Sequence, residues 1–174
     1  MQMMSSEVKR QFLEFKPVTF RDRKGDEVTI RQYHHEEDRE RLISMYESFS
    51  PDNRCLGLPP STRIAIENWI DYLAENGFAI VAELGGKLIG HCVIVPTADW
   101  KKVDLSIFVH QDYQDRGIGQ ALLGQIIDYA KRMGFDGIML VTERDNHRAV
   151  HVYKKFGFRI VNPEHEFDMY LQLR

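Results

Sequence analysis

Hydrophobic and polar positions along the chain follow two periods, and these periods predict strands and helices. Alternating residues or short apolar runs between turn residues are typical of strands, whereas apolar residues three or four positions apart are typical of amphipathic helices. The predicted strands span residues 28–33, 78–84, 87–95, 102–110, 137–142 and 167–173, with a further short strand around Val18 and Phe20. The predicted helices span residues 36–49, 61–75, 117–133 and 146–156.

Turn residues between these elements predict several of their boundaries. Gly85-Gly86 separates two apolar-rich runs, which is a strong hairpin signal because glycine accepts the positive φ angles of such turns. Ser61 is expected to cap the second helix, and Gly134 to end the third. Two helices, an antiparallel hairpin and then alternating strands and helices predict an α/β (α+β) fold, in which a mixed sheet carries helices on both faces.

Length and composition narrow the class of protein. The chain has 174 residues, of which 43% are hydrophobic and 28% charged. These values predict one soluble globular domain at residues 18–174, after an N-terminal extension at residues 1–17 that is either a short helix or a flexible lead-in. No apolar stretch approaches the ~20 residues of a membrane span. A net charge of −3 without a basic run argues against a nucleic-acid partner.

The residues that commonly bind metals do not form a recognisable ligand set. Cys55 and Cys92 alone make neither a disulfide framework nor a metal cluster, so a reducing, cytoplasmic location is expected. His147 and His151 lie four residues apart on a predicted helix and could share a zinc ion, but no third ligand accompanies them. We therefore expect no metal.

A glycine-containing turn stands between the strand at residues 102–110 and the strongest predicted helix. Its sequence is Gln114-Asp115-Arg116-Gly117-Ile118-Gly119-Gln120. Two glycines leave backbone N–H groups uncovered beside the positive end of a helix, an arrangement suited to a pyrophosphate, although a lone Gly-x-Gly is more often only a turn. Leu122 replaces the third glycine of a dinucleotide fingerprint, and Gly124 is not followed by the Lys-Ser/Thr of a nucleotide P-loop.

A third kind of glycine loop matches. The pattern Gln114-x-x-Gly117-x-Gly119, after the strand that ends at His110, resembles the coenzyme A pyrophosphate loop of the GNAT superfamily of N-acyltransferases. Asn146, Ala149 and Tyr153, followed by Lys155-Phe156-Gly157-Phe158, are similar to a later helix and strand of that family. The resemblance covers residues 28–173. It implies a mixed, mostly antiparallel sheet of six to seven strands that is splayed in the middle.

The resemblance also implies where acetyl-CoA, the expected cosubstrate, binds. The pantetheine arm would lie between the strands at residues 103–110 and 137–142, and the amides of residues 116–120 would hold the pyrophosphate. The Arg116 side chain would either reach a phosphate or stay exposed. The implied cofactor-binding residues are Ile107, Phe108, Val109, Gln114, Asp115, Arg116, Gly117, Ile118, Gly119, Gln120, Asn146 and Tyr153.

Two residues are candidates for proton transfer. The resemblance places Tyr153 near the thioester sulfur, where a phenol of pKa about 10 could protonate the departing thiolate. A lysine amine has a pKa of about 10.4 and needs a base to accept its proton, and the resemblance assigns this role to Asp104. Val141 occupies the other position at which the family carries a base, which leaves Glu83 and Glu143 as alternatives. The simpler interpretations are a packed tyrosine, a solvated aspartate and, for Asn146, a plain helix cap.

Several acceptors of the acetyl group are compatible with the sequence. The loop at residues 49–60 resembles the acceptor side of the catalytic domains of bacterial and archaeal protein-lysine acetyltransferases. A protein lysine is therefore the leading acceptor, while a small-molecule amine or a protein N-terminus is compatible with the same sequence. Neither cysteine matches a nucleophile position, which favours direct transfer in a ternary complex. The alternatives are a non-catalytic acyl-CoA sensor and a plain interaction domain, as a monomer or a homodimer.

Overall fold

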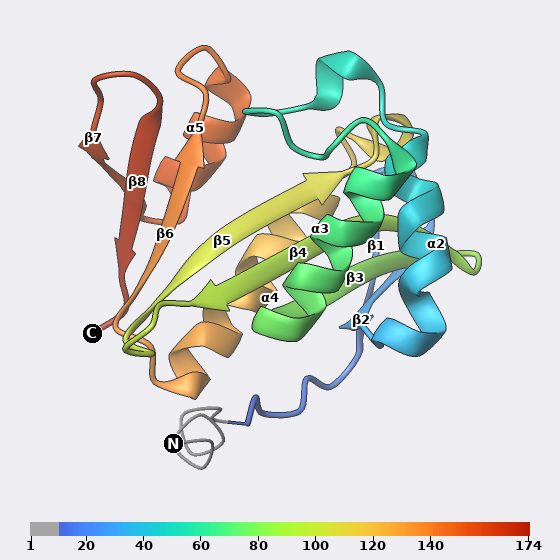
Figure 1. Cartoon of the computed structure of the whole chain (residues 1–174), viewed down its shortest axis with the longest axis horizontal. Helices are drawn as coiled ribbons and strands as arrows, with labels where there is room; N and C mark the ends of the chain where they lie inside the picture. Colours follow the sequence, from blue (N-terminus) through green and yellow to red (C-terminus); the bar gives the residue numbers. More distant parts are fainter. Residues whose placement is uncertain (1–10) are drawn as a thin grey trace.

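One continuous sheet organises the chain, in the strand order β1-β2-β3-β4-β5-β6-β8-β7 (Figure 1). The structure is a computed structural model that describes residues 11–174. Its strands are β1 (Val18–Arg21), β2 (Glu27–Gln32), β3 (Phe78–Leu84), β4 (Lys87–Pro96), β5 (Lys102–Val109), β6 (Gly137–Thr142), β7 (Arg159–Asn162) and β8 (Phe167–Gln172). Neighbouring strands are antiparallel except β5 and β6, which confirms the predicted mixed sheet. The described residues form eight strands rather than six to seven, because the hydrophobic pattern does not show β7.

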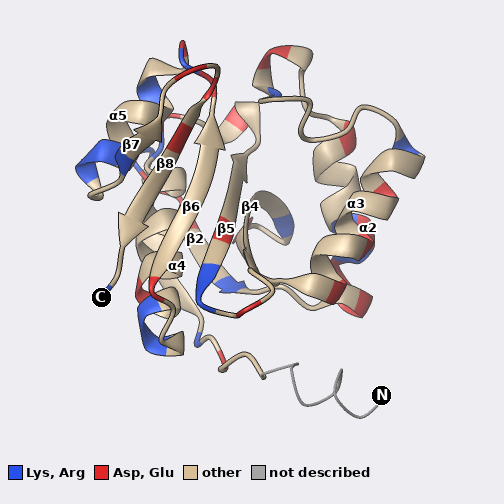
Figure 2. Cartoon of the chain, turned by 60° about the vertical axis from the view of Figure 1, so that its left-hand side comes forward, with Lys and Arg blue, Asp and Glu red and all other residues tan. Residues whose placement is uncertain are grey.

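Helices cover both faces of this sheet, as predicted. They are α2 (His35–Glu47), α3 (Arg63–Asn76), α4 (Ile118–Met133) and α5 (His147–Lys155), together with short 3-10 turns η1 (Pro51–Asn53) and η2 (Gln111–Tyr113). Figure 2 shows α2 and α3 on the side of β4 and β5 opposite to α4 and α5. No helix within residues 11–174 combines the length and the apolarity needed to cross a bilayer.

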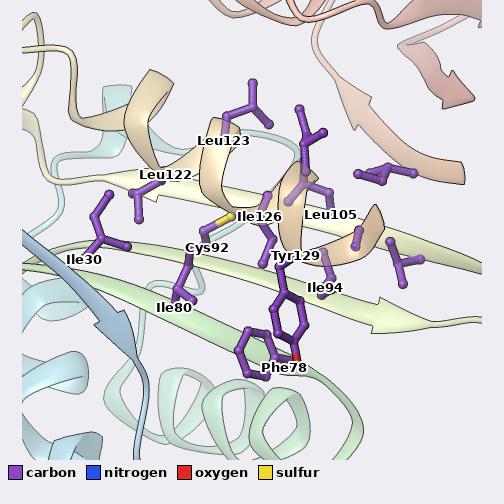
Figure 3. Close-up of a cluster of buried hydrophobic side chains, with 14 of the residues drawn as sticks. Ile30, Phe78, Ile80, Cys92, Ile94, Leu105, Leu122, Leu123, Ile126 and Tyr129 are labelled. Atoms are coloured by element: carbon purple, nitrogen blue, oxygen red, sulfur yellow. The ribbon is translucent and has the colours of Figure 1, made fainter. Parts of the chain in front are cut away.

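The main core lies between the sheet and α4. Leu122, Ile126 and Tyr129 of α4 are buried against β3, β4 and β5, and the Tyr129 ring stacks on Phe78 with ring centroids 4.0 Å apart (Figure 3). Cys92 belongs to this cluster and packs there as a small core residue. The Tyr129 hydroxyl also donates a hydrogen bond of 2.7 Å to the Leu13 carbonyl, which holds the segment before β1 against the core.

Two predicted helix ends can be compared with the structure. Thr62 rather than Ser61 caps α3, since the Thr62 side chain accepts a hydrogen bond of 3.3 Å from the Ala65 amide. Gly134 ends α4 in the left-handed region, as predicted. Residues 11–17 form neither a helix nor a strand, and residues 1–10 lie outside the described residues.

β5 and β6 separate soon after they begin. They pair only at Lys102 with Gly137, Val103 with Ile138 and Asp104 with Met139. Beyond that point β5 remains paired with β4 as far as Val109, and β6 remains paired with β8 as far as Thr142. The two strands therefore diverge within an otherwise continuous sheet, which confirms the predicted splay (Figure 1).

A buried ion pair fixes α2 to β2. The Asp38 side chain is 1% exposed and accepts two hydrogen bonds of 2.8 Å from the Arg31 guanidinium on β2. It also accepts bonds from Arg41, at 2.6 Å, and from the His34 amide, at 2.8 Å. Burial alone would raise the pKa of Asp38, but these donors outweigh it and lower the pKa to about 2.

We predict that Asp38→Asn destabilises the fold by about 3 kcal/mol at pH 7, because it removes the buried carboxylate that holds the Arg31 guanidinium with two hydrogen bonds and leaves only Glu83, at 3.3 Å, as its carboxylate partner. The unfolded carboxyl titrates near pH 3.9, so the wild-type protein should lose this stabilisation as the pH falls from about 4 towards 2. Urea unfolding at several pH values measures both effects. Glu40→Gln, at an exposed ion pair with Arg63, is the control that should change little. An equal free energy of unfolding for Asp38→Asn and the wild-type protein would contradict the prediction.

Candidate active site

The divergence of β5 and β6 opens a groove of about 740 Å³. Its walls are the two strands, the glycine turn, the start of α5 and the loop between α2 and α3. Twelve of the thirteen residues selected from the sequence line this groove, and Arg116 is the exception. The topology therefore brings together residues from three separate parts of the chain.

The glycine turn presents uncovered backbone amides to the groove. Gly117 has φ of +85° and α4 begins at the next residue, so the first-turn amides of the helix lack helical partners. The first helical bond is the one from Ala121 to the Gly117 carbonyl, and the amides of residues 117–120 donate to no other described residue. A Cβ on Gly117 would have only the Arg23 side chain nearby, at 3.9 Å. This part of the groove therefore has room, positive polarity and free donors for a pyrophosphate.

Arg116 does not have either of the roles considered for its side chain. The guanidinium lies against Asp22, at 3.3 Å, and Asp26, at 3.2 Å, and over the Tyr113 ring, at 4.9 Å. Its side chain is 12% exposed, so it is neither an exposed arginine nor a lining residue of the groove. Arg116 instead joins the glycine turn to the turn between β1 and β2, and only its backbone can contribute to the cradle.

Arg23, rather than Arg116, places a positive side chain beside the glycine turn. The Arg23 amide donates a hydrogen bond of 3.1 Å to the Arg116 carbonyl, and its side chain lines the groove beside Gly117. No sequence pattern pointed to Arg23. Arg23 reaches the site because Asp22 and Asp26, on either side of it in the sequence, bind Arg116, which lies 90 or more residues further along the chain.

The backbone of β5 turns alternate peptide groups towards the groove. The His110 amide donates to the Ile89 carbonyl of the neighbouring chain segment at 2.9 Å, so the even-numbered peptide groups of this strand face β4. Those of Ile107 and Val109 consequently face the gap left by β6. Phe108 was also expected to bind the cofactor, but its peptide group faces β4, so only its side chain can face the groove.

Two side-chain amides hold the last peptide group of β5. Asn53 donates a hydrogen bond of 3.1 Å to the Val109 carbonyl, and Gln114 donates one of 3.2 Å to the same oxygen. Gln114 also contacts the Asn53 side chain. Gln114 therefore acts in the site by fixing the Val109 peptide, and Asn53 is a contributor that the sequence did not reveal.

Asn146 and Tyr153 both belong to α5: Asn146 is its N-cap residue, and Tyr153 lies in its last turn. Asn146 caps the helix by accepting a hydrogen bond of 3.3 Å from the Ala149 amide, and it also lines the groove, so its two interpretations are compatible. The Tyr153 hydroxyl has no hydrogen-bond partner among residues 11–174. Burial raises the pKa of Tyr153, so the hydroxyl stays protonated at neutral pH.

Asp104 lies where β5 and β6 separate. It is the last residue of β5 that pairs with β6, and it lines the groove. Although its side chain reaches solvent, partial burial by the groove walls raises the pKa of Asp104 above the ordinary value of 3.8. Of the alternatives, Glu143 lines the groove and accepts a hydrogen bond of 3.0 Å from the Leu56 amide, whereas Glu83 is paired with Arg31 and Arg41 away from it.

The histidines noted in the sequence do not assemble a metal site in the described part of the chain. His147 and His151 are both exposed on α5. Within residues 11–174, no three histidine, cysteine, aspartate or glutamate side chains come together in an arrangement that could hold a metal ion.

Comparison with known proteins identifies the family. The model of the acetyltransferase (GNAT) family matches residues 20–158, and the chain belongs to this family. It is 34% identical to an uncharacterized N-acetyltransferase of Methanocaldococcus jannaschii over 96 residues, which are 52% of this chain and 42% of that protein. The chain spans about half the length of the curated relatives it matches.

Solved structures show the same fold. The GNAT domain of PAT from S. lividans is 18% identical, with a TM-score of 0.76 over 91% of this chain and 99% of that one. The PaiA N-acetyltransferase from Thermoplasma acidophilum, solved in complex with coenzyme A, is 21% identical, with a TM-score of 0.66 over 83% of this chain and 98% of that one. At these identities the likeness concerns the fold.

We predict that Gly117→Ala weakens coenzyme A binding at least about tenfold, because a methyl group would enter the space beside the turn amides. Isothermal titration calorimetry measures the dissociation constant. Gly86→Ala is a matched control, since Gly86 also has a positive φ, of +80°, but lies in the hairpin between β3 and β4. Equal affinities for the two variants would contradict the assignment of the cradle.

Proposed function

We propose that this chain transfers the acetyl group of acetyl-CoA to a primary amine, by direct attack of the amine in a ternary complex. The observation that carries the proposal is the row of uncovered amides at residues 117–120, placed at the mouth of the gap between β5 and β6. Membership of the acetyltransferase (GNAT) family supports it. The thioester arm would extend from the cradle between the two strands, alongside the peptide groups of Ile107 and the amide of Val109, whose carbonyl is already held by Asn53 and Gln114.

Each chemical step has a candidate residue in the groove. The amine nitrogen forms a bond to the carbonyl carbon of the thioester, and the carbon–sulfur bond breaks. The Val109 amide would donate a hydrogen bond to the carbonyl oxygen as negative charge develops there. Tyr153 would give its hydroxyl proton to the departing thiolate, and Asp104 would accept the proton of the amine, directly or through water.

The state of the two cysteines supports direct transfer. Burial raises the pKa of both Cys92 and Cys55, so neither is a thiolate at neutral pH. Cys92 is also completely buried in the core. A route through an acetylated cysteine would need a reactive thiolate on the groove, and the described residues offer none.

We propose the acceptor only as a chemical class, that of cationic amines. The groove carries carboxylates at Asp52, Asp104, Glu143 and Asp145, which favour a cationic amine. The protein lysine expected from the sequence is one such amine, and a small-molecule amine and a protein N-terminus are the others. The cytoplasmic location and the choice between monomer and homodimer stay predictions.

Tyr153→Phe tests the enzyme against a coenzyme A sensor. We expect kcat to fall about 100-fold, because the thiolate loses its proton donor, while the dissociation constant of acetyl-CoA changes little. Release of coenzyme A with a panel of amines measures kcat, and calorimetry measures binding. Acetyl-CoA binding by the wild-type protein without transfer to any amine would instead support a non-catalytic acyl-CoA sensor.

Asp104→Asn tests the base through pH. At pH 8 we expect kcat/KM to fall about 100-fold, because the amide cannot accept a proton. The ratio of wild-type to variant activity should be constant at high pH and fall towards one as Asp104 becomes protonated, at a pH above the 3.8 of an ordinary aspartate. Asp128→Asn, on the exposed side of α4, is the control. A ratio that does not depend on pH would exclude Asp104 as the base.

A further inference from the structure

The loop between α2 and α3 holds Arg54 in a defined place over the groove. On one side of it, Asn53 is hydrogen-bonded to the Val109 carbonyl at the end of β5. On the other side, Cys55 and Leu58 exchange backbone hydrogen bonds of 2.7 and 3.0 Å around a tight turn. The Leu56 amide in that turn reaches Glu143, just after β6. The loop therefore spans the open ends of both strands, and Figure 1 shows it (residues 48–62, teal) crossing from α2 towards β6.

The Arg54 guanidinium lacks a protein partner. Its Nε atom is buried and has no hydrogen-bond acceptor among the described residues, and no carboxylate of these residues lies within 4.0 Å of the side chain. The Nε atom of Arg116 is also buried without an acceptor, but the Arg116 guanidinium is paired with Asp22 and Asp26, as that of Arg31 is with Asp38 and Glu83. Arg54 has no such carboxylate among the described residues. A buried donor without an acceptor is unfavourable, and an anion in the groove would remove that deficit.

The other arginines of the groove already have distinct positions. Of the three that line it, Arg23 lies beside Gly117 at the proposed pyrophosphate cradle, and Arg148 is ion-paired with Asp115. Arg54 belongs instead to the loop between α2 and α3, the helices that cover the other face of the sheet. Side chains alternate along β5, so Asp104 points to the same face as Phe108, whose ring packs at 5.5 Å on Trp69 of α3. Arg54 and Asp104 are thus on the acceptor side, and Arg23 is on the coenzyme side.

We propose that Arg54 binds a carboxylate carried by the acceptor, so that the substrates are amines that also bear a carboxylate, namely free amino acids. This inference rests on the proposed acetyl transfer. A planar guanidinium fits a carboxylate with two parallel hydrogen bonds. The acidic groups of the groove attract the amine and Arg54 binds the acid group, so the two ends of a zwitterion have opposite partners.

Matched pairs of acceptors test this assignment. Acetylation of the standard amino acids and of the corresponding amino-acid amides is measured by mass spectrometry at saturating acetyl-CoA. For at least one amino acid we expect kcat/KM to exceed that of its amide by about tenfold or more, because only the acid pairs with Arg54. Arg54→Gln should remove this preference by lowering the value for the acid, with little change for the amide.

Two further variants separate the possible roles of Arg54. Arg159→Gln, at an exposed position of β7, should leave the preference for the acid intact. Arg23→Gln should weaken acetyl-CoA binding and also leave the preference intact. If Arg54→Gln weakens acetyl-CoA binding and changes acid and amide equally, Arg54 serves the coenzyme and the proposal is wrong. Acetylation of lysine-containing peptides or of amides in preference to every free amino acid would overturn it as well.

A binding measurement keeps the inference independent of turnover. Free amino acids are titrated calorimetrically into the wild-type protein saturated with coenzyme A, and then into Arg54→Gln. The proposal is supported if an amino acid binds to the wild-type protein, while its amide does not bind and the Arg54→Gln variant does not bind the amino acid. This holds even if no acetyl group is transferred, in which case the proposed function alone fails. The proposal fails if no free amino acid is bound or acetylated.

Discussion

β5 pairs with β4 from Val103 to Val109 but with β6 only as far as Asp104. Every feature of the site depends on this loss of pairing. A strand inside a sheet normally satisfies its peptide groups on both sides, whereas Ile107 and Val109 turn theirs towards an open groove. The Ile107 amide and carbonyl and the Val109 amide can then pair with an extended ligand in the way that a neighbouring strand would, and a ligand with amides along its length suits such an edge.

The surrounding structure keeps this edge open and fixed. Asn53 and Gln114 hold the Val109 carbonyl by hydrogen bonds, which occupy a group that β6 would otherwise pair with. His110, which is 5% exposed, contacts the Ser48 hydroxyl at 2.8 Å, and Ser48 donates in turn to the Met45 carbonyl of α2. These contacts join the end of β5 to the end of α2, where the loop between α2 and α3 begins. Arg116 joins the glycine turn to the first hairpin in the same manner.

The sequence predicted the elements and the coenzyme side well, because both depend on local patterns. Alternation, helical periodicity and the Gly117-x-Gly119 turn are properties of short segments. The hydrophobic pattern missed β7 because only Ile160 of its four residues is even partly buried, so the strand shows no alternation. Arg116 was misjudged because its partners Asp22 and Asp26 are brought to it only by the tertiary fold. Arg23 and Asn53 were missed for the same reason, and no residue spacing could show that Arg54 lacks a partner.

A crystal structure of the protein with coenzyme A tests the central claim most directly. The account predicts pyrophosphate oxygens within hydrogen-bond distance of the amides of residues 117–120 and the pantetheine arm between β5 and β6, with its amides facing Ile107 and Val109. It also predicts the thiol beside the Tyr153 hydroxyl. Coenzyme A bound elsewhere on the chain, or β5 and β6 paired along their full length in the complex, would contradict it.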